Sequence, residues 1–497
     1  MSEKRKKLVL AVVDALKPEM LERAIEHGRA PILAKIRERG TYVRDCVSAF
    51  PSVTPVAAAS IATGLGPADH HIPAMNWYHR GERRYVEYGS SFDASRAFGV
   101  LESLTDTVYN MNMAHLNRER RTVFESLQDS GVRTAGTTYL MYRGRTRHVA
   151  SSDGMYSRLA RAGGFRHAVW GPDELFYADL IASRRTPCRS GLGMPGQRDQ
   201  HTACVGAYLV ENDLCDFLLA SLPDNDTYSH RRGPYAQVTS IESADRALER
   251  ITHAAGGLDE FLEDHAIVVM SDHSQIAVVD EINLADVLSD HHLLLPTAPD
   301  DPAAEIAICP SQRSAQVYVL DPEREAELAP RIARHLRTIE GADLAMYLHG
   351  DEAVVLSARG ELRFAPGAAY DDGRGGRWDL EGDTETLGLS LDDGRASSAA
   401  YPDALERVWS ALNCPFAGDV LVSAGGGYEF SDWGGVAHVG GGSHGSLHRG
   451  DSLGVLLYSG TGPKETPSQW RIRDVTPMIL DHFSAPSSDP HQGSLDS

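Results

Sequence analysis

Residues 8–16 read LVLAVVDAL, a run of apolar side chains that ends in an aspartate. Every residue of Leu8–Val13 is apolar, so this segment cannot alternate between a core face and a solvent face as a half-exposed strand does. Three further runs share this character, and the four together predict strands that are covered on both faces. The three are FLLASL (Phe217–Leu222), AIVVM (Ala266–Met270) and GVLLY (Gly454–Tyr458).

Helical patterns lie between these strands. Pro18–Arg39 holds one or two helices, Val123–Asp129 begins another, and Ser240–Asp264 repeats its apolar residues at helical spacing over a long stretch. Strands that alternate with helices predict an α/β fold, here a three-layer sandwich whose central, mostly parallel sheet carries helices on both faces. Ligands of such sheets collect at the carboxyl ends of the strands.

Two regions do not follow this pattern and are interpreted as insertions. Residues of about 77–120 are rich in Tyr, Arg and Asn, and they predict a loop-rich insertion within an α/β core of residues 1–294. Residues 295–430 predict an inserted α+β subdomain, in which AVVLSARGELRFAPG is typical of an antiparallel hairpin around Arg359-Gly360. Residues 431–484 are expected to return to the core, and the polar residues 485–497 to form a disordered tail.

Charge limits the partners of this chain. Its 497 residues include 48 Lys plus Arg against 69 Asp plus Glu, a formal net charge of −21. A field of this sign repels polyanions, so we expect neither nucleic acid polymers nor a membrane surface as partners. The oligomeric state stays open.

Cysteine usage and the N-terminus bear on location. The six cysteines contain no Cys-x-x-Cys pair, which argues against a disulfide scaffold or a thiolate zinc site and fits a reducing compartment. The six-residue apolar run after the basic N-terminus is shorter than the roughly 7–15 residues of a signal-peptide core. No other stretch approaches the roughly 20 apolar residues of a membrane span. The expected location is cytoplasmic.

Carboxylates and imidazoles gather where the predicted strands end. Each alone has an ordinary alternative: a helix cap, a polar loop residue or a surface histidine. Together they offer oxygen and nitrogen ligands without thiolate, a set that suits zinc, manganese or iron and is large enough for two metal ions. The six residues are Asp14, Asp226, His230, Asp272, His273 and His444.

Thr54 is the candidate nucleophile. It lies in AFPSVTPVAAASIATGLGP (residues 49–67), where Pro55 and Gly64 predict the start and the end of a helix. The ordinary alternative is that Thr54 is only the N-cap of that helix. A hydroxyl at a helix N-terminus also lies beside free N–H groups that can bind a phosphoryl oxygen, and a metal ion on the hydroxyl would activate it.

These motifs, in this order, resemble the alkaline phosphatase superfamily, and within it the nucleotide pyrophosphatase/phosphodiesterase branch. The resemblance covers roughly 5–75, 120–280 and 435–485 and leaves the insertions unexplained. Besides the Asp226 and His230 pair with the following Gly233-Pro234, the matching pieces are VVDAL (Val12–Leu16), FPSVT (Phe50–Thr54), SIATG (Ser60–Gly64), MSDHS (Met270–Ser274), GSHGS (Gly442–Ser446) and RDVTPMILDHF (Arg473–Phe483).

The resemblance implies two divalent metal ions, usually zinc, with manganese or iron as alternatives. Asp226, His230 and His444 would hold one of them. The second would be held by Asp14, Asp272 and His273 together with the Thr54 oxygen. Thr54 would then attack phosphorus to form a phosphothreonine that is hydrolysed in a second step.

The expected function is that of a metal-dependent phosphodiesterase or nucleotide pyrophosphatase acting on a small phosphorylated substrate. A phosphomonoesterase or a phosphonate hydrolase of the same superfamily is the first alternative. A catalytically inactive relative that binds a ligand is the second. A sulfatase is not expected, because Thr54-Pro55-Val56 does not fit the Cys/Ser-x-Pro-x-Arg context of that branch.

One position departs from the family pattern. The branch commonly has an Asn three residues after the nucleophile to hold a phosphate oxygen, and here that residue is Ala57. The helix N–H groups or Asn76 are the candidate replacements. Two further sets of candidates have a less specific pattern. Trp77 and Tyr78 could stack on a leaving group, and Arg143, Arg145 and Arg147 could attract phosphate. The residues His70, His71 and His448 are not expected to be ligands.

Overall fold

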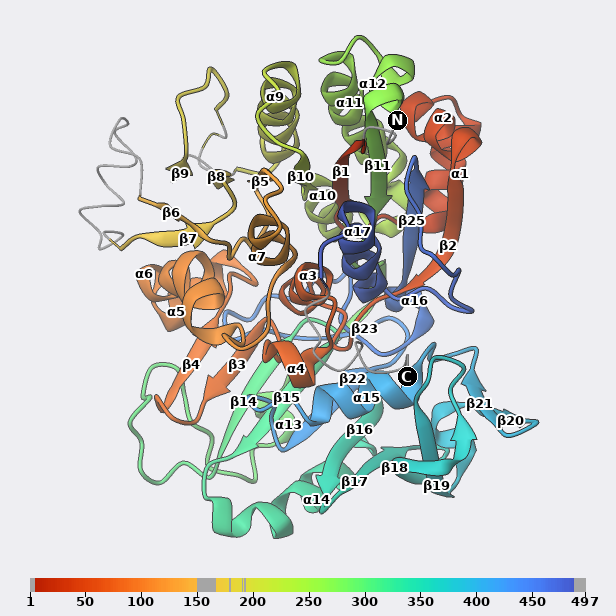
Figure 1. The fold of residues 1–497 in the computed structure, drawn as a ribbon. Coiled ribbons are helices and arrows are strands. Elements are labelled where there is room, and N and C mark those ends of the chain that lie inside the picture. Colours follow the sequence, from red (N-terminus) through yellow and green to blue (C-terminus); the bar gives the residue numbers. More distant parts are fainter. Residues whose placement is uncertain (1–4, 150–166, 178–179, 190, 192–193, 487–497) are drawn as a thin grey trace.

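A parallel sheet forms the centre of the α/β core (Figure 1). The computed structural model describes residues 5–149, 167–177, 180–189, 191 and 194–486. The eight strands of the sheet, in spatial order, are β2 (Thr41–Val47), β25 (Leu453–Ser459), β11 (His265–Met270), β1 (Lys7–Val13), β10 (Phe217–Leu222), β5 (Thr134–Thr137), β8 (Glu174–Tyr177) and β9 (Ile181–Ala182).

Strand β1 lies near the middle of this sheet and pairs in parallel with β10 on one side and β11 on the other. Strands β5 and β8 continue the parallel part beyond β10, while β25 is antiparallel to both β11 and β2. All four apolar runs of the sequence are strands of this sheet. The prediction of a mostly parallel sheet is confirmed.

Successive residues of β1 point to opposite faces of the sheet, as the period of a strand requires. Leu8, Leu10 and Val12 join one apolar cluster, and Val9, Ala11 and Val13 join another. Helices cover both faces, so the predicted three-layer arrangement is confirmed. The first face carries α3 (Thr54–Thr63), α7 (Val123–Asp129) and α17 (Val475–Phe483); the second carries α1 (Pro18–Glu26), α2 (Pro31–Arg39), α9 (Arg198–Glu211), α11 (Val238–His253) and α12 (Leu258–Asp264).

The long helix predicted over Ser240–Asp264 is interrupted. Helix α11 ends at His253 and α12 begins at Leu258. Between them Gly256 and Gly257 have φ of 103° and 133°, a backbone conformation that glycine adopts without a steric penalty. Helical periodicity resumes after the turn, and for this reason the sequence pattern alone did not reveal the break.

A second, largely antiparallel sheet occupies the region of the predicted α+β insertion and lies at the end of the molecule away from α11 and α12 (Figure 1). Helices α14 (Glu325–Leu336) and α15 (Ala404–Leu412) pack on its opposite faces. The expected hairpin is present, with Ser357 facing Gly360. The strands are β14 (Ile306–Ser311), β15 (Ser314–Val319), β22 (Val420–Ala424), β16 (Ala342–His349), β17 (Glu352–Ser357), β18 (Gly360–Asp371), β21 (Arg395–Ser398) and β20 (Leu389–Asp392), with β19 (Arg377–Gly382) paired to β18.

The region of about 77–120 is more regular than the loop-rich insertion that the sequence predicts. It holds a two-stranded hairpin followed by helices, because the apolar faces of Trp77 and Tyr85 pack into the core. Its elements are β3 (Asn76–His79), β4 (Arg84–Glu87), α5 (Phe92–Phe98), α6 (Val100–Thr105) and a π-helix over Asp106–His115.

Short elements complete the described part of the chain. The remaining strand pairs are β6 (Thr146–His148) with β7 (Val169–Gly171), β12 (Ile276–Ala277) with β24 (Gly442–Ser443), and β13 (Asp280–Ile282) with β23 (Tyr428–Phe430). The remaining α-helices are α4 (Pro67–His70), α10 (Asp224–Arg232), α13 (Leu284–Val287) and α16 (Arg449–Ser452). Of the predicted disordered tail, residues 487–497 lie outside the described residues.

No helix within the described ranges has both the length and the apolar character that a bilayer crossing requires.

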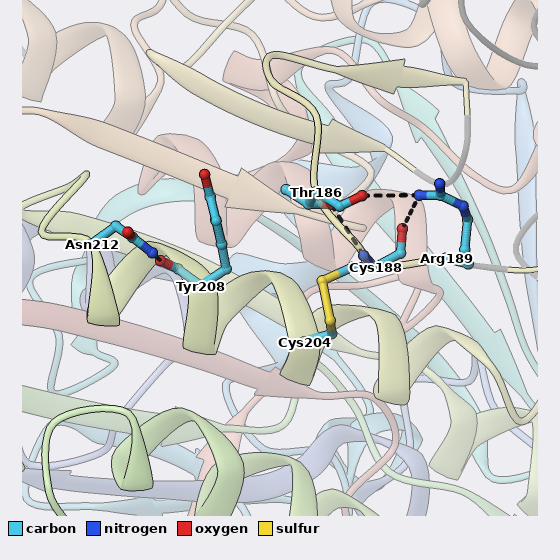
Figure 2. The surroundings of a disulfide bond; sticks show 6 residues. All are labelled: Thr186, Cys188, Arg189, Cys204, Tyr208 and Asn212. Carbon is cyan, nitrogen blue, oxygen red and sulfur yellow. Dashed lines mark hydrogen bonds between the residues drawn. A yellow bond between two sulfur atoms is a disulfide. The ribbon is translucent and has the colours of Figure 1, made fainter.

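A disulfide joins Cys188 to Cys204 near the N-terminal half of α9 (Figure 2), with 5.7 Å between the Cα atoms. The sparse cysteines did not predict it. The loop before it is held locally, since the Arg189 guanidinium donates to the carbonyls of Thr186 and Cys188 at 3.0 and 2.9 Å. The other four cysteines are buried thiols.

Thiol counting tests this pairing. Denatured, unreduced protein is expected to react with four equivalents of an alkylating reagent, and reduced protein with six, because only Cys188 and Cys204 are paired. Intact mass measures both numbers. Six reactive thiols in protein that was purified without reductant would contradict the disulfide.

Candidate metal centre

Strands β1 and β11 and helix α10 bring five of the seven predicted residues to one place. Asp14 directly follows β1, and Asp272 and His273 come just after β11, at the carboxyl ends of adjacent parallel strands. Asp226 and His230 lie on α10, which follows β10. The ordinary alternative for these two residues was a polar loop. They lie instead on a helix, and the spacing of four residues places both side chains on the same face of it.

Helix α3 carries the candidate nucleophile. Its N-cap is Val53, and Thr54 is the first helical residue with no capping hydrogen bond from a side chain. The prediction that Thr54 caps the helix is therefore wrong by one residue. The predicted end is confirmed, since Gly64 follows the last turn with φ of 75°. The Thr54 hydroxyl instead lies 3.2 Å from Nε2 of His273.

The loop that carries His444 is held by the second sheet. The backbone N–H of Arg313 donates to the carbonyl of His444 at 2.9 Å. The Arg313 guanidinium in turn pairs with Asp451 at 2.8 Å, with both side chains fully buried. Gly445 has φ of 122°, and a side chain there would press on the backbone of Ser311 and Arg313. The second sheet thus fixes one of the candidate ligands of the core.

His273 lies at the centre of the assembled cluster. Its Nε2 is 3.4 Å from Asp14 Oδ1 and 3.5 Å from Asp272 Oδ2. Its ring also stacks on that of His444, with 3.6 Å between the ring centroids and 13° between the planes. The structure therefore brings both predicted ligand groups together through one imidazole.

Asp226 connects the second group. Its Oδ2 is 3.2 Å from His230 Nε2, and its Oδ1 is 3.6 Å from His444 Nε2. Two sets of ligand atoms lie close enough to share an ion: Asp226, His273 and His444 form one, and Asp14, Asp272 and His273 form the other. All seven predicted residues meet at this place, and His230 joins through its contact with Asp226.

The three imidazoles are oriented in the same way. The Nδ1 atoms of His230, His273 and His444 lie 2.8, 3.2 and 2.8 Å from the backbone carbonyls of Gly442, Ser274 and Ser52, respectively. A carbonyl only accepts, so Nδ1 carries the proton and Nε2 points to the carboxylates. An outer hydrogen bond of this kind is typical of metal-ligating histidines.

Unpaired polar atoms indicate what the cluster accommodates. Within the described residues, Asp14 Oδ1 and His444 Nε2 are buried without a hydrogen-bond partner. Burying such acceptors costs free energy unless a cation or a donor reaches them. Three carboxylates and three inward-facing imidazole nitrogens fit divalent cations, and the residues present therefore suit a metal centre.

The electrostatics agree with this arrangement. Burial raises the pKa of Asp14 well above its usual range, and the carboxylates of Asp272 and Asp226 raise this pKa further. Burial and the adjacent His273 lower the pKa of His444 well below its usual range, which keeps that ring neutral. Bound cations would offset the repulsion among the three carboxylates, and the neutral His444 ring could ligate one of them through Nε2.

Four of the lesser candidates of the sequence have structural roles outside the cluster. Trp77 is fully buried and stacks on Phe416 at a centroid distance of 5.0 Å, so it packs the core. Arg143 is buried in a network with Glu125 and backbone carbonyls, and Arg145 pairs with Glu125 and Asp129. Asn76 donates its side-chain amide to the carbonyl of Val86 within the β3–β4 hairpin.

Sequence reasoning missed the residues that hold the ligands in place. Gln275, directly after the SDHS motif, donates to Asp226 Oδ1 at 2.5 Å. Asn225 donates to the Asp14 carbonyl at 2.8 Å, next to Asp226 on α10. Their positions beside the motifs were the available signal. Asp451, which pairs with Arg313, had no comparable signal.

The site thus combines a threonine at the start of a helix with carboxylate–histidine groups at the carboxyl edge of a parallel sheet. The family model for type I phosphodiesterase / nucleotide pyrophosphatase matches residues 8–446. The chain belongs to this family.

Solved structures share the fold over nearly the whole chain. Phosphonoacetate hydrolase from Sinorhizobium meliloti 1021, in complex with phosphonoformate, is 17% identical, with 97% of this chain and 96% of that chain covered and a TM-score of 0.57. Murine ectonucleotide pyrophosphatase / phosphodiesterase 5, in an inactive threonine-to-alanine form with AMP, is 11% identical with the same coverage and TM-score. A comparison with curated proteins found no match.

Proposed function

We propose that this protein is a phosphodiesterase or nucleotide pyrophosphatase that uses Thr54 as its nucleophile and two divalent metal ions, most simply zinc. One observation carries the proposal: the Thr54 hydroxyl lies 3.2 Å from Nε2 of His273, the residue that both candidate ligand groups share. A hydroxyl with only a capping role would instead accept from the backbone of its own helix.

The ligand assignment is the one that the family resemblance implies. Asp14, Asp272, His273 and the Thr54 oxygen would hold one ion, and Asp226, His230 and His444 the other. The contacts support it in part, since Asp226 and His444 lie close enough to share an ion and His230 contacts Asp226. Ions bound there would supply Lewis-acid stabilisation and lower the pKa of a coordinated hydroxyl. Support comes from the carbonyl bonds at the three Nδ1 atoms, because they leave each Nε2 free to act as a ligand.

The residues of the chain divide the reaction between them. The Thr54 oxygen forms a bond to phosphorus as the bond to the leaving group breaks, and the proton of Thr54 is released. Water then hydrolyses the phosphothreonine and restores the hydroxyl. The first turn of α3 presents backbone N–H groups and the positive end of a ten-residue helix to the phosphoryl oxygens. These N–H groups would hold the phosphate oxygen that the family's Asn commonly binds, at the position where this chain has Ala57.

A phosphonate hydrolase is the second candidate, and the likeness to phosphonoacetate hydrolase favours it. Both reactions use attack on a tetrahedral phosphorus, so the ligand cluster does not separate them. An inactive relative is disfavoured by the convergence of all seven predicted residues. The expected substrate is a small phosphorylated molecule in either case, and AMP and phosphonoformate are ligands of the two structural neighbours.

The cytoplasmic location stays a prediction. The Cys188–Cys204 disulfide counts against it, because disulfides rarely persist in reducing compartments.

A substrate panel tests the proposed function. Bis-p-nitrophenyl phosphate, p-nitrophenyl phosphate, a nucleotide-sugar, a dinucleotide and phosphonoacetate are compared by kcat/KM with zinc-loaded protein. We expect the diester and the two nucleotide substrates to exceed the monoester and the phosphonate by at least about tenfold, a difference of about 1.4 kcal/mol in transition-state stabilisation. A preference for phosphonoacetate would replace the proposal by the second candidate. No turnover despite two bound metal ions would indicate the inactive relative.

A further inference from the structure

Glu429, on β23, carries a buried carboxylate that receives three hydrogen bonds. Its Oε1 accepts from the Ser443 hydroxyl at 2.6 Å and lies 2.9 Å from Nδ1 of His438, and its Oε2 accepts from the His438 backbone N–H at 2.6 Å. Only 2% of the Glu429 side chain is exposed. A carboxylate is brought into such an environment only at a cost, which these donors offset.

Both partners of Glu429 lead to His230. The His438 ring packs on the His230 ring with 4.1 Å between the centroids and 32° between the planes. Ser443 follows Gly442, whose carbonyl meets Nδ1 of His230 at 2.8 Å. The Glu429 carboxylate thus holds two groups that contact His230. One is the His438 ring, which packs on the His230 ring, and the other is the short strand β24, whose Gly442 carbonyl orients the His230 ring. Ser443 is also the residue before His444, a second candidate ligand.

We propose that Glu429 is a positioning residue for the Asp226, His230 and His444 group, and that it acts through His438 and Ser443. The inference rests on the proposed function, because it assigns a role toward the metal ion of that group. Glu429 touches neither the metal ligands nor the nucleophile in any contact described above. Its effect is to hold the His438 ring on His230 and the strand whose carbonyl orients His230. A group bonded directly to a metal ligand is worth about 10–100-fold in metal affinity, and Glu429 acts one residue further away, so an effect of about tenfold is expected.

The ordinary alternative is that Glu429 only stabilises the loop between β23 and β24. A metal-affinity measurement separates the two roles. Glu429→Gln keeps the size of the side chain but has a single acceptor oxygen, so its NH2 group must face one of the three donors. Glu281→Gln is the matched control, since Glu281 is the register partner of Glu429 on β13 and accepts a hydrogen bond from Ser431, but is exposed.

The experiment is a zinc titration of chelator-stripped protein, followed by calorimetry or by competition with a coloured chelator. For Glu429→Gln we expect one of two zinc equivalents to bind about tenfold more weakly and the other to be unchanged, because Glu429 acts through the neighbours of a ligand and not on the ligand itself. Turnover should return at saturating zinc, and the melting temperature of the stripped protein should match that of Glu281→Gln. His438→Phe keeps an aromatic ring on His230 but loses the bond to Glu429, and the same equivalent should weaken to a smaller degree.

Three outcomes would overturn the inference: two equivalents of wild-type affinity in Glu429→Gln, equal weakening of both, or a loss of affinity that only follows a lower melting temperature. If Glu429→Gln does not fold, His438→Phe decides between the roles by the same criteria. The wild-type titration tests the proposed function separately. A wild-type protein that binds fewer than two equivalents would contradict the two-metal centre before any variant is compared.

Discussion

Thr54→Ala is expected to lose about 10⁴–10⁶-fold in turnover, a range typical of removing a nucleophile that acts in concert with its neighbours. The structure makes the stability effect small. Thr54 makes no capping hydrogen bond, and alanine is a better helix former than threonine, so the free energy of unfolding should change by less than about 1 kcal/mol. Stopped-time assays and thermal melts of the zinc-loaded variant measure both quantities.

Thr54→Ser serves as the control for this prediction. It keeps the hydroxyl and removes only the methyl group that restricts the rotamer of threonine, so measurable turnover should remain. A Thr54→Ala protein with near-normal turnover would exclude covalent catalysis. Direct attack by water within the same cluster would then be the remaining mechanism.

Removing the metal ions should abolish turnover and also lower the melting temperature. Asp14, Asp226 and Asp272 converge on His273 and its stacked partner His444, and without cations the carboxylates repel one another. Ligands that bind only the folded state stabilise it by about 4 kcal/mol at a thousandfold excess over Kd. Dialysis against a chelator, followed by thermal melts and turnover assays, measures the loss.

Zinc or manganese should restore both properties, whereas magnesium should do so poorly, because imidazole ligands suit the transition metals. Asp272→Asn is the informative variant. It removes one charge from the group around Thr54 and should lose at least one metal equivalent with turnover reduced by several orders of magnitude. Full turnover after exhaustive dialysis against chelator would rule out metal dependence.

Local patterns accounted for the strands and for the order of the motifs. The all-apolar runs predicted β1, β10, β11 and β25 to within a residue at each end, because a strand buried on both faces needs apolar side chains throughout. The polar residues that follow such strands had to lie at the carboxyl edge of the sheet. The class of ligands at that edge, carboxylate and imidazole, was therefore readable from the sequence.

Long-range packing decided what the motifs could not indicate. His444 is oriented by the carbonyl of Ser52, 392 residues away along the chain, and its loop is held by Arg313, which lies between β14 and β15 of the second sheet. Hydrogen bonds between residues so distant in sequence leave no periodic pattern. Glu429, His438 and the pairing of Cys188 with Cys204 were not predicted for another reason: these partners lie only 9 and 16 residues apart, but no motif marked them.

The sequence by itself determined the α/β core, the family and the seven residues of the candidate centre, because buried strands and metal ligands require particular residue types at particular places. The tertiary structure alone decided that Thr54 begins its helix without capping it, and that its hydroxyl meets His273. It also decided that a single imidazole connects the two ligand groups. Distances between side chains depend on how helices and sheets pack, and that packing is fixed by contacts spread over the whole chain.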